Sequence, residues 1–390
     1  MKNQDYQPEN PRPAVKEKLN NPTDTLLNAL LEVEACGTCV TMVIPMQTVH
    51  PLSDQNPISL KEARKSLEEQ LAIAGLEREG INAYLEHFDQ LTEDFDRKHQ
   101  EAALVIFIAE NLQRAIKLPI ESRFYISIND HFAIKHVLRA ANRFPHALLL
   151  NLNKDVVDVF EMTRDTLRPI KTDLLPAEYK PFISAFMENT QESKDVIDDR
   201  AEAEWLNHIR HSLHEVVMQV QLPLIVAGTD RIRLGFVKGW DRPGTPIIAQ
   251  VPGSFKRDEM RHQLHEKAIK AYDDLVDAQQ QQHTIEAREI AGGRDAAEAI
   301  STLWPLAQLG QVNTLYVEKD YKTNGWVNID GNEVKMNDED LRAHEDYNHH
   351  DDIVAELIES VVRHGGKVHF LPQQSLADYG HAVAHLRYSR

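Results

Sequence analysis

The sequence predicts an α/β protein with more than one domain, and its C-terminal segment shows the pattern most plainly. Apolar residues recur at helical spacing over 353–362, and Gly365 and Gly366 follow where a helix must stop. Alternation of apolar and polar residues then predicts a strand over 367–371. A helix, a glycine stop and a strand make up half of an α/β layer, and a last strand is expected over 381–388.

A second observation is that helix and strand patterns alternate in the N-terminal third of the chain. A first helix is expected to begin at Thr23 or Asp24 as cap and to run to Leu31. A second is expected to begin at Ser59, because Ser59 and Glu62 have the spacing of a capping box. The strand-like runs are 39–46, 103–108 and 123–128, and the other helical runs are 77–99 and 131–142.

A third observation is a hairpin pattern in the middle of the chain. Two apolar runs, 147–152 and 156–161, flank the polar turn Asn153–Asp155. We expect the rest of the chain to continue with helices over 200–220, 263–282 and 294–309 and with strands over 222–227, 231–237 and 312–318.

The length of 390 residues exceeds what one ordinary core supports. We therefore predict a disordered N-terminus and three domains. Their ranges are 1–20 for the disordered segment, 21–144 for an N-terminal α/β domain, 145–262 for a middle domain and 263–390 for a C-terminal domain.

The charge balance bears on the class of partner. The net charge is −18, from 43 basic and 61 acidic residues, which argues against a protein that coats nucleic acid non-specifically. A local basic surface is still able to dock on RNA. No apolar run approaches the roughly 20 residues of a membrane helix, and the polar N-terminus lacks the apolar core of a signal peptide, so a cytoplasmic protein with no membrane contact is expected.

The most basic region lies between residues 101 and 145. Lys135, Arg139 and Arg143 recur every four residues, which places them on one face of the expected helix. Together with Arg123 on the preceding strand, they are the candidates for contact with RNA or the ribosome. A solvated helix face is the alternative interpretation of the same pattern.

Three other groups carry residue types that bind metals or react. Cys36 and Cys39 have the spacing of a redox pair or half a zinc site, but a buried pair beside a turn explains them better. The histidines of the 200–220 helix and a nearby acidic group offer metal ligands, although a surface stripe and a charged loop are the simpler interpretations. These residues are His208, His211 and His214 and Asp195, Asp198 and Asp199. No phosphate-binding glycine loop and no nucleophile elbow occurs, so no cofactor is expected.

Several short motifs carry a resemblance to a known family. In the C-terminal part, Gly310 precedes a strand that begins at Val312, and Gly365-Gly366 is followed by a closing Leu386-Arg387-Tyr388. This part resembles the C-terminal domain shared by archaeal and eukaryotic class I release factors and Pelota. Upstream, the order of the motifs resembles the bacterial archaeo-eukaryotic release factor family. These motifs are Val43-Ile44-Pro45, Ser59-Leu60 with Ala63-Arg64, Val105–Ile108, Ala147–Leu150 and Val159-Phe160.

The resemblance implies a middle domain of ribonuclease-H-like topology and a C-terminal domain like kink-turn-binding ribosomal proteins. It also implies work at the ribosome, in translation rescue or regulation, with the ribosome or ribosomal RNA as partner and further protein partners left open.

One departure from the family concerns its chemistry. Release factors carry Gly-Gly-Gln in the middle domain and a codon-reading Asn-Ile-Lys-Ser, and neither motif occurs here. The two Gly-Gly pairs are followed by Arg294 and Lys367. We therefore expect a ribosome- or RNA-binding protein without that hydrolase chemistry. The alternatives are a metal-dependent nuclease that uses the middle domain and a protein-interaction module.

Overall fold

The computed structural model divides the chain into two compact units. One unit contains His146–Ala271, and the other combines Thr23–Pro145 with Tyr272–Arg390. The residues that the structure describes are 30–31, 37–47, 55–93, 102–118, 122–141, 146–164, 166–170, 178–187, 193–220, 222–242, 244–256, 260–336 and 346–388. The predicted disordered segment 1–20 and Cys36 lie outside these ranges. None of the described helices has the length and apolar character that a membrane crossing requires.

The 146–271 unit is built on a five-stranded mixed sheet with the order β7-β6-β5-β8-β9. Strand β5 pairs in parallel with β8, and β8 with β9, whereas β6 and β7 add antiparallel strands. The hairpin expected from the polar turn is thus confirmed as β5 and β6. The bounds are β5 Ala147–Leu152, β6 Val157–Met162, β7 Leu167–Pro169, β8 Leu224–Gly228 and β9 Ile247–Pro252.

Both faces of this sheet are covered, which explains why β5 is apolar throughout. On one face of the sheet, Leu148 and Leu150 pack with Trp205 of α6 (Lys194–Val220). Leu149 faces the opposite side, where it packs with Leu264 of α8 (Arg261–Ile290). A short helix α5, Lys180–Met187, lies within the stretch between β7 and α6.

The strand expected over 231–237 is wrong, because these residues belong to helix α7, Asp230–Lys238. The buried residues of α7 are Ile232 and Phe236, four positions apart, which is helical spacing. The neighbour of β8 is instead β9, which follows α7 in the chain.

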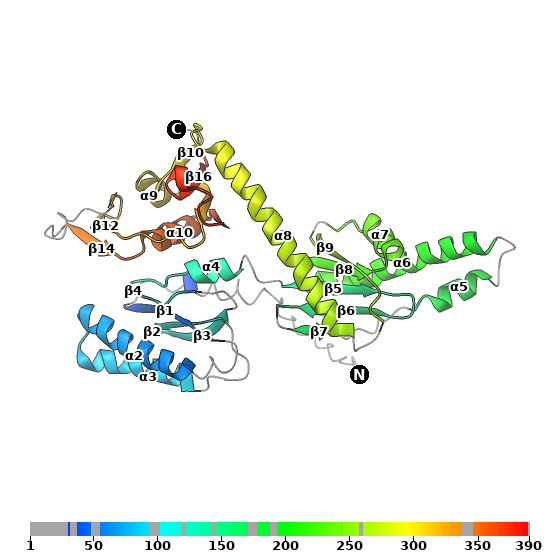
Figure 1. The fold of residues 1–390 in the computed structure, drawn as a ribbon, viewed down its shortest axis with the longest axis horizontal. Helices are drawn as coiled ribbons and strands as arrows, with labels where there is room; N and C mark the ends of the chain where they lie inside the picture. Colours follow the sequence, from blue (N-terminus) through cyan, green and yellow to red (C-terminus); the bar gives the residue numbers. More distant parts are fainter. Residues whose placement is uncertain are drawn as a thin grey trace, which may run out of the picture. The chain divides into compact units, whose positions relative to one another are not determined.

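The N-terminal part of the second unit is an antiparallel sheet with the order β3-β2-β1-β4. Its strands are β1 Cys39–Pro45, β2 Ala103–Ala109, β3 Leu112–Leu118 and β4 Tyr125–Asn129. Helices α2 (Asn56–Ile73) and α3 (Arg78–Glu93) lie side by side on one face (Figure 1), where Met42 and Ile106 point. Helix α4, Lys135–Ala141, packs on the other face against Val43 and Phe107.

Helix α2 begins three residues before the expected capping box, so Ser59 is a helical residue and not a cap. Pro57 occupies the first turn, where the missing N–H of proline costs no hydrogen bond. The buried Asn56 side chain accepts a hydrogen bond from the Gln47 amide at 2.8 Å and donates to the Gln47 carbonyl at 2.9 Å. These bonds fix the start of α2 against the end of β1.

The C-terminal part of the same unit has a sheet with the order β10-β16-β11-β15 and a small sheet β13-β12-β14. Helices α9 (Ile300–Gln308) and α10 (Ile353–Arg363) pack on one face of the larger sheet, and Ala287 of α8 packs on the other. The strands are β10 Ala296–Glu298, β11 Val312–Glu318, β12 Gly325–Asn328, β13 Val334–Lys335, β14 Tyr347–His350, β15 Lys367–Leu371 and β16 Ala382–Leu386. The helix expected over 294–309 starts late, because β10 occupies its first turn.

The expected helix, glycine stop and strand of the C-terminal segment are confirmed as α10, Gly365-Gly366 and β15. Gly365 has a φ of +73°, in the left-handed region that favours glycine. Gly366 is required for a different reason, because a Cβ there would lie 2.6 Å from Val361 Cγ1 and 3.0 Å from the Val312 carbonyl oxygen.

The close approach at Gly366 predicts a stability loss on substitution. Gly366→Ala should lower the free energy of unfolding by about 1–3 kcal/mol, because the added methyl overpacks a site bounded by backbone. Gly80→Ala in α3 is the control, since its Cβ would meet only Leu76 Cδ2 at 3.9 Å and alanine favours a helix. Denaturant unfolding measures both variants, and equal stability of Gly366→Ala and the wild type would contradict the packing argument.

Candidate basic cleft

Three of the four sequence-predicted basic residues line one cleft in the unit that combines 23–145 with 272–390. Arg123 is exposed just before β4, and Lys135 and Arg139 lie on α4. Arg143 lies outside the described residues. The cleft has a volume of about 670 Å³.

The C-terminal part of the unit contributes two more cations, Lys319 and Lys322, which sequence reasoning missed. They follow β11 and are distant from α4 in sequence, so only the tertiary fold brings them together. Five basic side chains and the two carboxylates Asp320 and Asp352 line the cleft. A chain of strongly negative net charge therefore has a locally positive hollow.

Lys135 is one of the residues that line the cleft, and it is buried. Its Nζ donates to the Tyr321 carbonyl at 2.7 Å and to Asp352 Oδ2 at 3.0 Å. Burial lowers the pKa of Lys135, and the neighbouring Asp352 carboxylate opposes this shift. The other oxygen of Asp352 accepts from the Ala355 amide at 3.2 Å and so caps α10. Lys135 therefore ties α4 to the N-terminus of α10.

Arg139 is also paired within the protein. Its Nη1 lies 2.9 Å from Asp320 Oδ1, and only 13% of its side chain is exposed. The face of α4 that was expected to meet RNA thus contacts acidic residues of the C-terminal part. The role of Lys135 and Arg139 in RNA contact stays a prediction, whereas their role in holding the unit together follows from the geometry.

Two buried polar atoms of the cleft have no hydrogen-bond partner among the described residues. They are Ser122 Oγ and His136 Nδ1. Burial, helped by the charges of Lys135, Arg139 and Lys322, lowers the pKa of His136 to about 3, so its imidazole is neutral near pH 7. The lining of the cleft therefore combines cations with two uncharged polar side chains, each of which has a buried atom without a partner in the described ranges.

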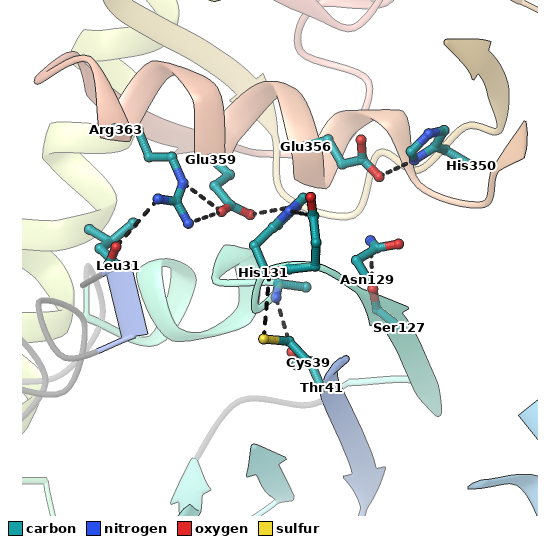
Figure 2. A network of polar contacts seen from close by, with 12 residues as sticks. Leu31, Cys39, Thr41, Ser127, Asn129, His131, His350, Glu356, Glu359 and Arg363 are labelled. Atoms are coloured by element: carbon teal, nitrogen blue, oxygen red, sulfur yellow. Dashed lines mark hydrogen bonds and ion pairs between the residues drawn. The ribbon is translucent and has the colours of Figure 1, made fainter. Parts of the chain in front are cut away.

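A second polar network fixes the segment that leads into α4 (Figure 2). His131 Nε2 lies 3.2 Å from Glu359 Oε2 of α10, and Glu359 Oε1 accepts from Arg363 Nε at 2.8 Å. The Ala133 amide donates to Thr41 Oγ1 at 2.9 Å. Burial raises the pKa of Glu359, while His131 and Arg363 oppose the rise. This network and the Lys135 pair together position α4 between the sheet and α10.

The other candidate groups are either engaged in structural contacts or exposed on the surface. Cys39 is buried, and its thiol donates to the Asp130 carbonyl at 3.6 Å. His208 and His211 are exposed on α6, and Asp199 pairs with Arg231 at 2.6 Å. Among the residues that the structure describes, no group of three His, Cys, Asp or Glu is placed to hold a metal ion.

The fold and the cleft define a mixed α/β protein with several sheets and a basic hollow in one unit. Comparison with protein-family models matches residues 148–311 to bacterial archaeo-eukaryotic release factor family 3, which confirms the resemblance inferred from the sequence. Residues 148–311 are thus similar to that family. No curated protein matches the sequence.

Solved structures of related description are also similar to this chain. An archaeal translation termination factor, aRF1, has 16% identity, with 94% of this chain and 97% of that chain covered and a TM-score of 0.21. Pelota from Archaeoglobus fulgidus has 15% identity, with 74% and 79% covered and a TM-score of 0.33. Dom34 from S. cerevisiae, described as a translation termination-like factor interacting with Hbs1, has 13% identity, with 74% and 80% covered and a TM-score of 0.35. Scores of this size mean that the whole chains superpose poorly.

The buried ion pair predicts a large cost when one partner is removed. Lys135→Met should destabilise the protein by about 3–5 kcal/mol, because it leaves the Asp352 carboxylate buried without its cation. Adding Asp352→Asn should recover part of this loss, since asparagine removes the charge and still caps α10. Lys65→Met, which breaks an exposed pair with Glu69, is the control and should cost less than about 1 kcal/mol. Calorimetric unfolding decides, and a double variant no more stable than Lys135→Met would contradict the pairing.

The neutral His136 predicts a dependence of stability on pH. The unfolded chain takes up a proton near pH 6.5, whereas the folded chain resists protonation down to about pH 3. The unfolded state therefore binds more protons in this window, and stability falls as the pH falls from about 6.5 towards 3. His136→Phe should reduce the drop in melting temperature between about pH 7 and pH 5. His211→Phe, at an exposed position, should leave the wild-type drop unchanged, and identical curves for all three proteins would contradict the assignment.

Proposed function

We propose that this protein binds ribosomes or RNA in translation rescue or regulation, and that the basic cleft provides the contact. The observation that carries the proposal is the meeting of Arg123, Lys319 and Lys322 from distant parts of an acidic chain in one hollow. No carboxylate of the described residues forms an ion pair with these three side chains. Phosphate groups are their natural partners, because charge-assisted hydrogen bonds to phosphate are strong.

The family match over 148–311 supports a role in translation. The absence of Gly-Gly-Gln and Asn-Ile-Lys-Ser from the sequence supports a function that uses neither the release chemistry nor the stop-codon reading of the family. A nuclease using Asp195, Asp198 and Asp199 gains no support from the geometry, because Asp198 accepts from Tyr179 and Asp199 pairs with Arg231.

The finer description of the domains belongs to the same proposal. We infer a ribonuclease-H-like middle domain over 145–262 and a C-terminal domain like kink-turn-binding ribosomal proteins over 263–390, with an N-terminal domain over 21–144. The mixed five-stranded sheet with helices on both faces supports the first assignment. We also infer that the protein works in the cytoplasm, where ribosomes are found. Protein partners in addition to the ribosome belong to the same proposal.

Co-sedimentation with ribosomes through a salt series tests the proposal. The wild type should sediment with ribosomes at low salt and lose binding as salt rises. A variant with Arg123→Glu, Lys319→Glu and Lys322→Glu should bind more weakly, and its salt slope should fall by about one for each phosphate that it no longer binds. Lys65→Glu is the matched control, because this exposed lysine of α2 does not line the cleft.

Two results would overturn the proposal. If the wild-type protein stays at the top of the gradient even at low salt, it does not bind ribosomes and the proposal is wrong. A triple variant that binds like the wild type and like Lys65→Glu would remove the cleft from the contact.

A further inference from the structure

We propose that the basic cleft is a binding site for a nucleotide unit, in which cations hold the phosphate and the Phe124 ring stacks on the base. This inference rests on the proposed function and names the ligand of the same site. The nucleotide unit is either part of a single-stranded stretch of RNA or a free nucleotide. Both present the same phosphate and base.

The size of the cleft fits such a ligand. Pockets for small molecules and cofactors usually measure about 300–1,000 Å³, and this cleft of about 670 Å³ lies within that range. An A-form duplex is far wider than one nucleotide, so the dimensions favour an unpaired unit.

The charges at the mouth of the cleft fit a phosphate. Arg123 and Lys322 are exposed and Lys319 is half-buried, and no ion pair engages them within the described ranges. The inner cations Lys135 and Arg139 are already paired with carboxylates. The outer three therefore hold the uncompensated positive charge.

Two residues that line the cleft, Ser122 and His136, each have a buried polar atom with no hydrogen-bond partner in the described part of the chain, which is an independent indication of a ligand. A buried polar atom without a hydrogen bond is costly, so a ligand that satisfies it binds more tightly. Both atoms are buried in the wall, so each side chain must turn towards the cleft to reach a ligand. The Ser122 hydroxyl then donates to a phosphate oxygen, and the neutral His136 ring does the same when its proton is on Nδ1. An inorganic anion would use these groups too, but it has no need of the ring described next.

An aromatic ring in the cleft provides a surface on which the base of the nucleotide can stack. Phe124 follows Arg123 in the chain, lines the same cleft and has 44% of its surface exposed. A large apolar ring left open beside cations is a typical platform for an unpaired base, and stacking contributes about 1–3 kcal/mol per base. An acidic peptide would meet the cations without any use for this ring, so the pair of features favours a nucleotide.

The test is a fluorescence titration of the full-length protein with a labelled single-stranded RNA of about ten nucleotides. Phe124→Leu keeps an apolar side chain but removes the ring, so it should weaken binding by about 5- to 150-fold. Phe124→Tyr keeps the ring and should retain binding. Ser122→Ala should weaken binding by a smaller factor, and Leu309→Ala is the control for an exposed apolar residue outside the cleft.

Competitors separate the two sources of the nucleotide. Displacement of the RNA by adenosine or uridine monophosphate indicates that one unit suffices. Failure of the monophosphates, with a Phe124-dependent RNA affinity, assigns the site to an RNA strand. Binding of the monophosphates alone assigns it to a free nucleotide. Each of these results supports the proposal.

Other outcomes overturn it. Inorganic phosphate, duplex RNA or polyglutamate that binds as tightly as the single strand, with no effect of Phe124→Leu, would leave only a general anion surface. If Phe124→Leu binds RNA like the wild type while Arg123→Glu, Lys319→Glu and Lys322→Glu still abolish co-sedimentation with ribosomes, the nucleotide site is wrong and the proposed function stands. Thermal unfolding of each variant checks that a loss of binding is not a loss of fold.

Discussion

The contact between Lys135 and Asp352 is the interaction on which the rest of the larger unit depends. It joins a helix that lies on the N-terminal sheet to the first turn of a helix that lies on the C-terminal sheet. Burying two charges is costly, and the cost is offset only because each charge has further partners: the Tyr321 carbonyl for the lysine and the Ala355 amide for the aspartate. Arg139 with Asp320 and His131 with Glu359 add contacts on the same two elements. The basic cleft exists because these pairs bring the strand before α4 and the segment after β11 together.

Local features of the fold are predictable from the sequence, because their signals are local. The glycine stop after α10 and the polar turn between β5 and β6 each depend on a few adjacent residues. Segment 231–237 resembles a strand because Ile232, Leu234 and Phe236 alternate, and this spacing competes with the four-residue spacing of Ile232 and Phe236 that the tertiary packing uses. The start of α2 escapes prediction because the bonds of Asn56 with Gln47, which are not local, outweigh the capping-box pattern.

The part of the site that has a local signal in the sequence is likewise predictable. The charge and spacing of Arg123, Lys135 and Arg139 single them out, but helical spacing does not tell whether a face meets solvent or another part of the chain. Lys319 and Lys322 carry no local signal, since two lysines after a strand are common on any surface. That Ser122 Oγ and His136 Nδ1 have no hydrogen-bond partner among the residues described can be recognised only from the tertiary structure. Charge pattern thus locates one wall of the cleft, and the tertiary structure supplies the other.

The contrast between the cleft and the whole chain has a kinetic consequence. At distances beyond about 10 Å in 0.1 M salt, charges are largely screened, and what remains of the field of a protein with net charge −18 repels any polyanion. Close to the cleft, the electrostatic field is positive, because the basic side chains that line it outnumber the carboxylates. If the cleft binds a polyanion as proposed, added salt should speed its approach and weaken its final attachment, so the rates of association and dissociation should both rise with ionic strength. Under the same proposal, the acidic surface would slow the association of every polyanion that does not place its charge directly in the cleft.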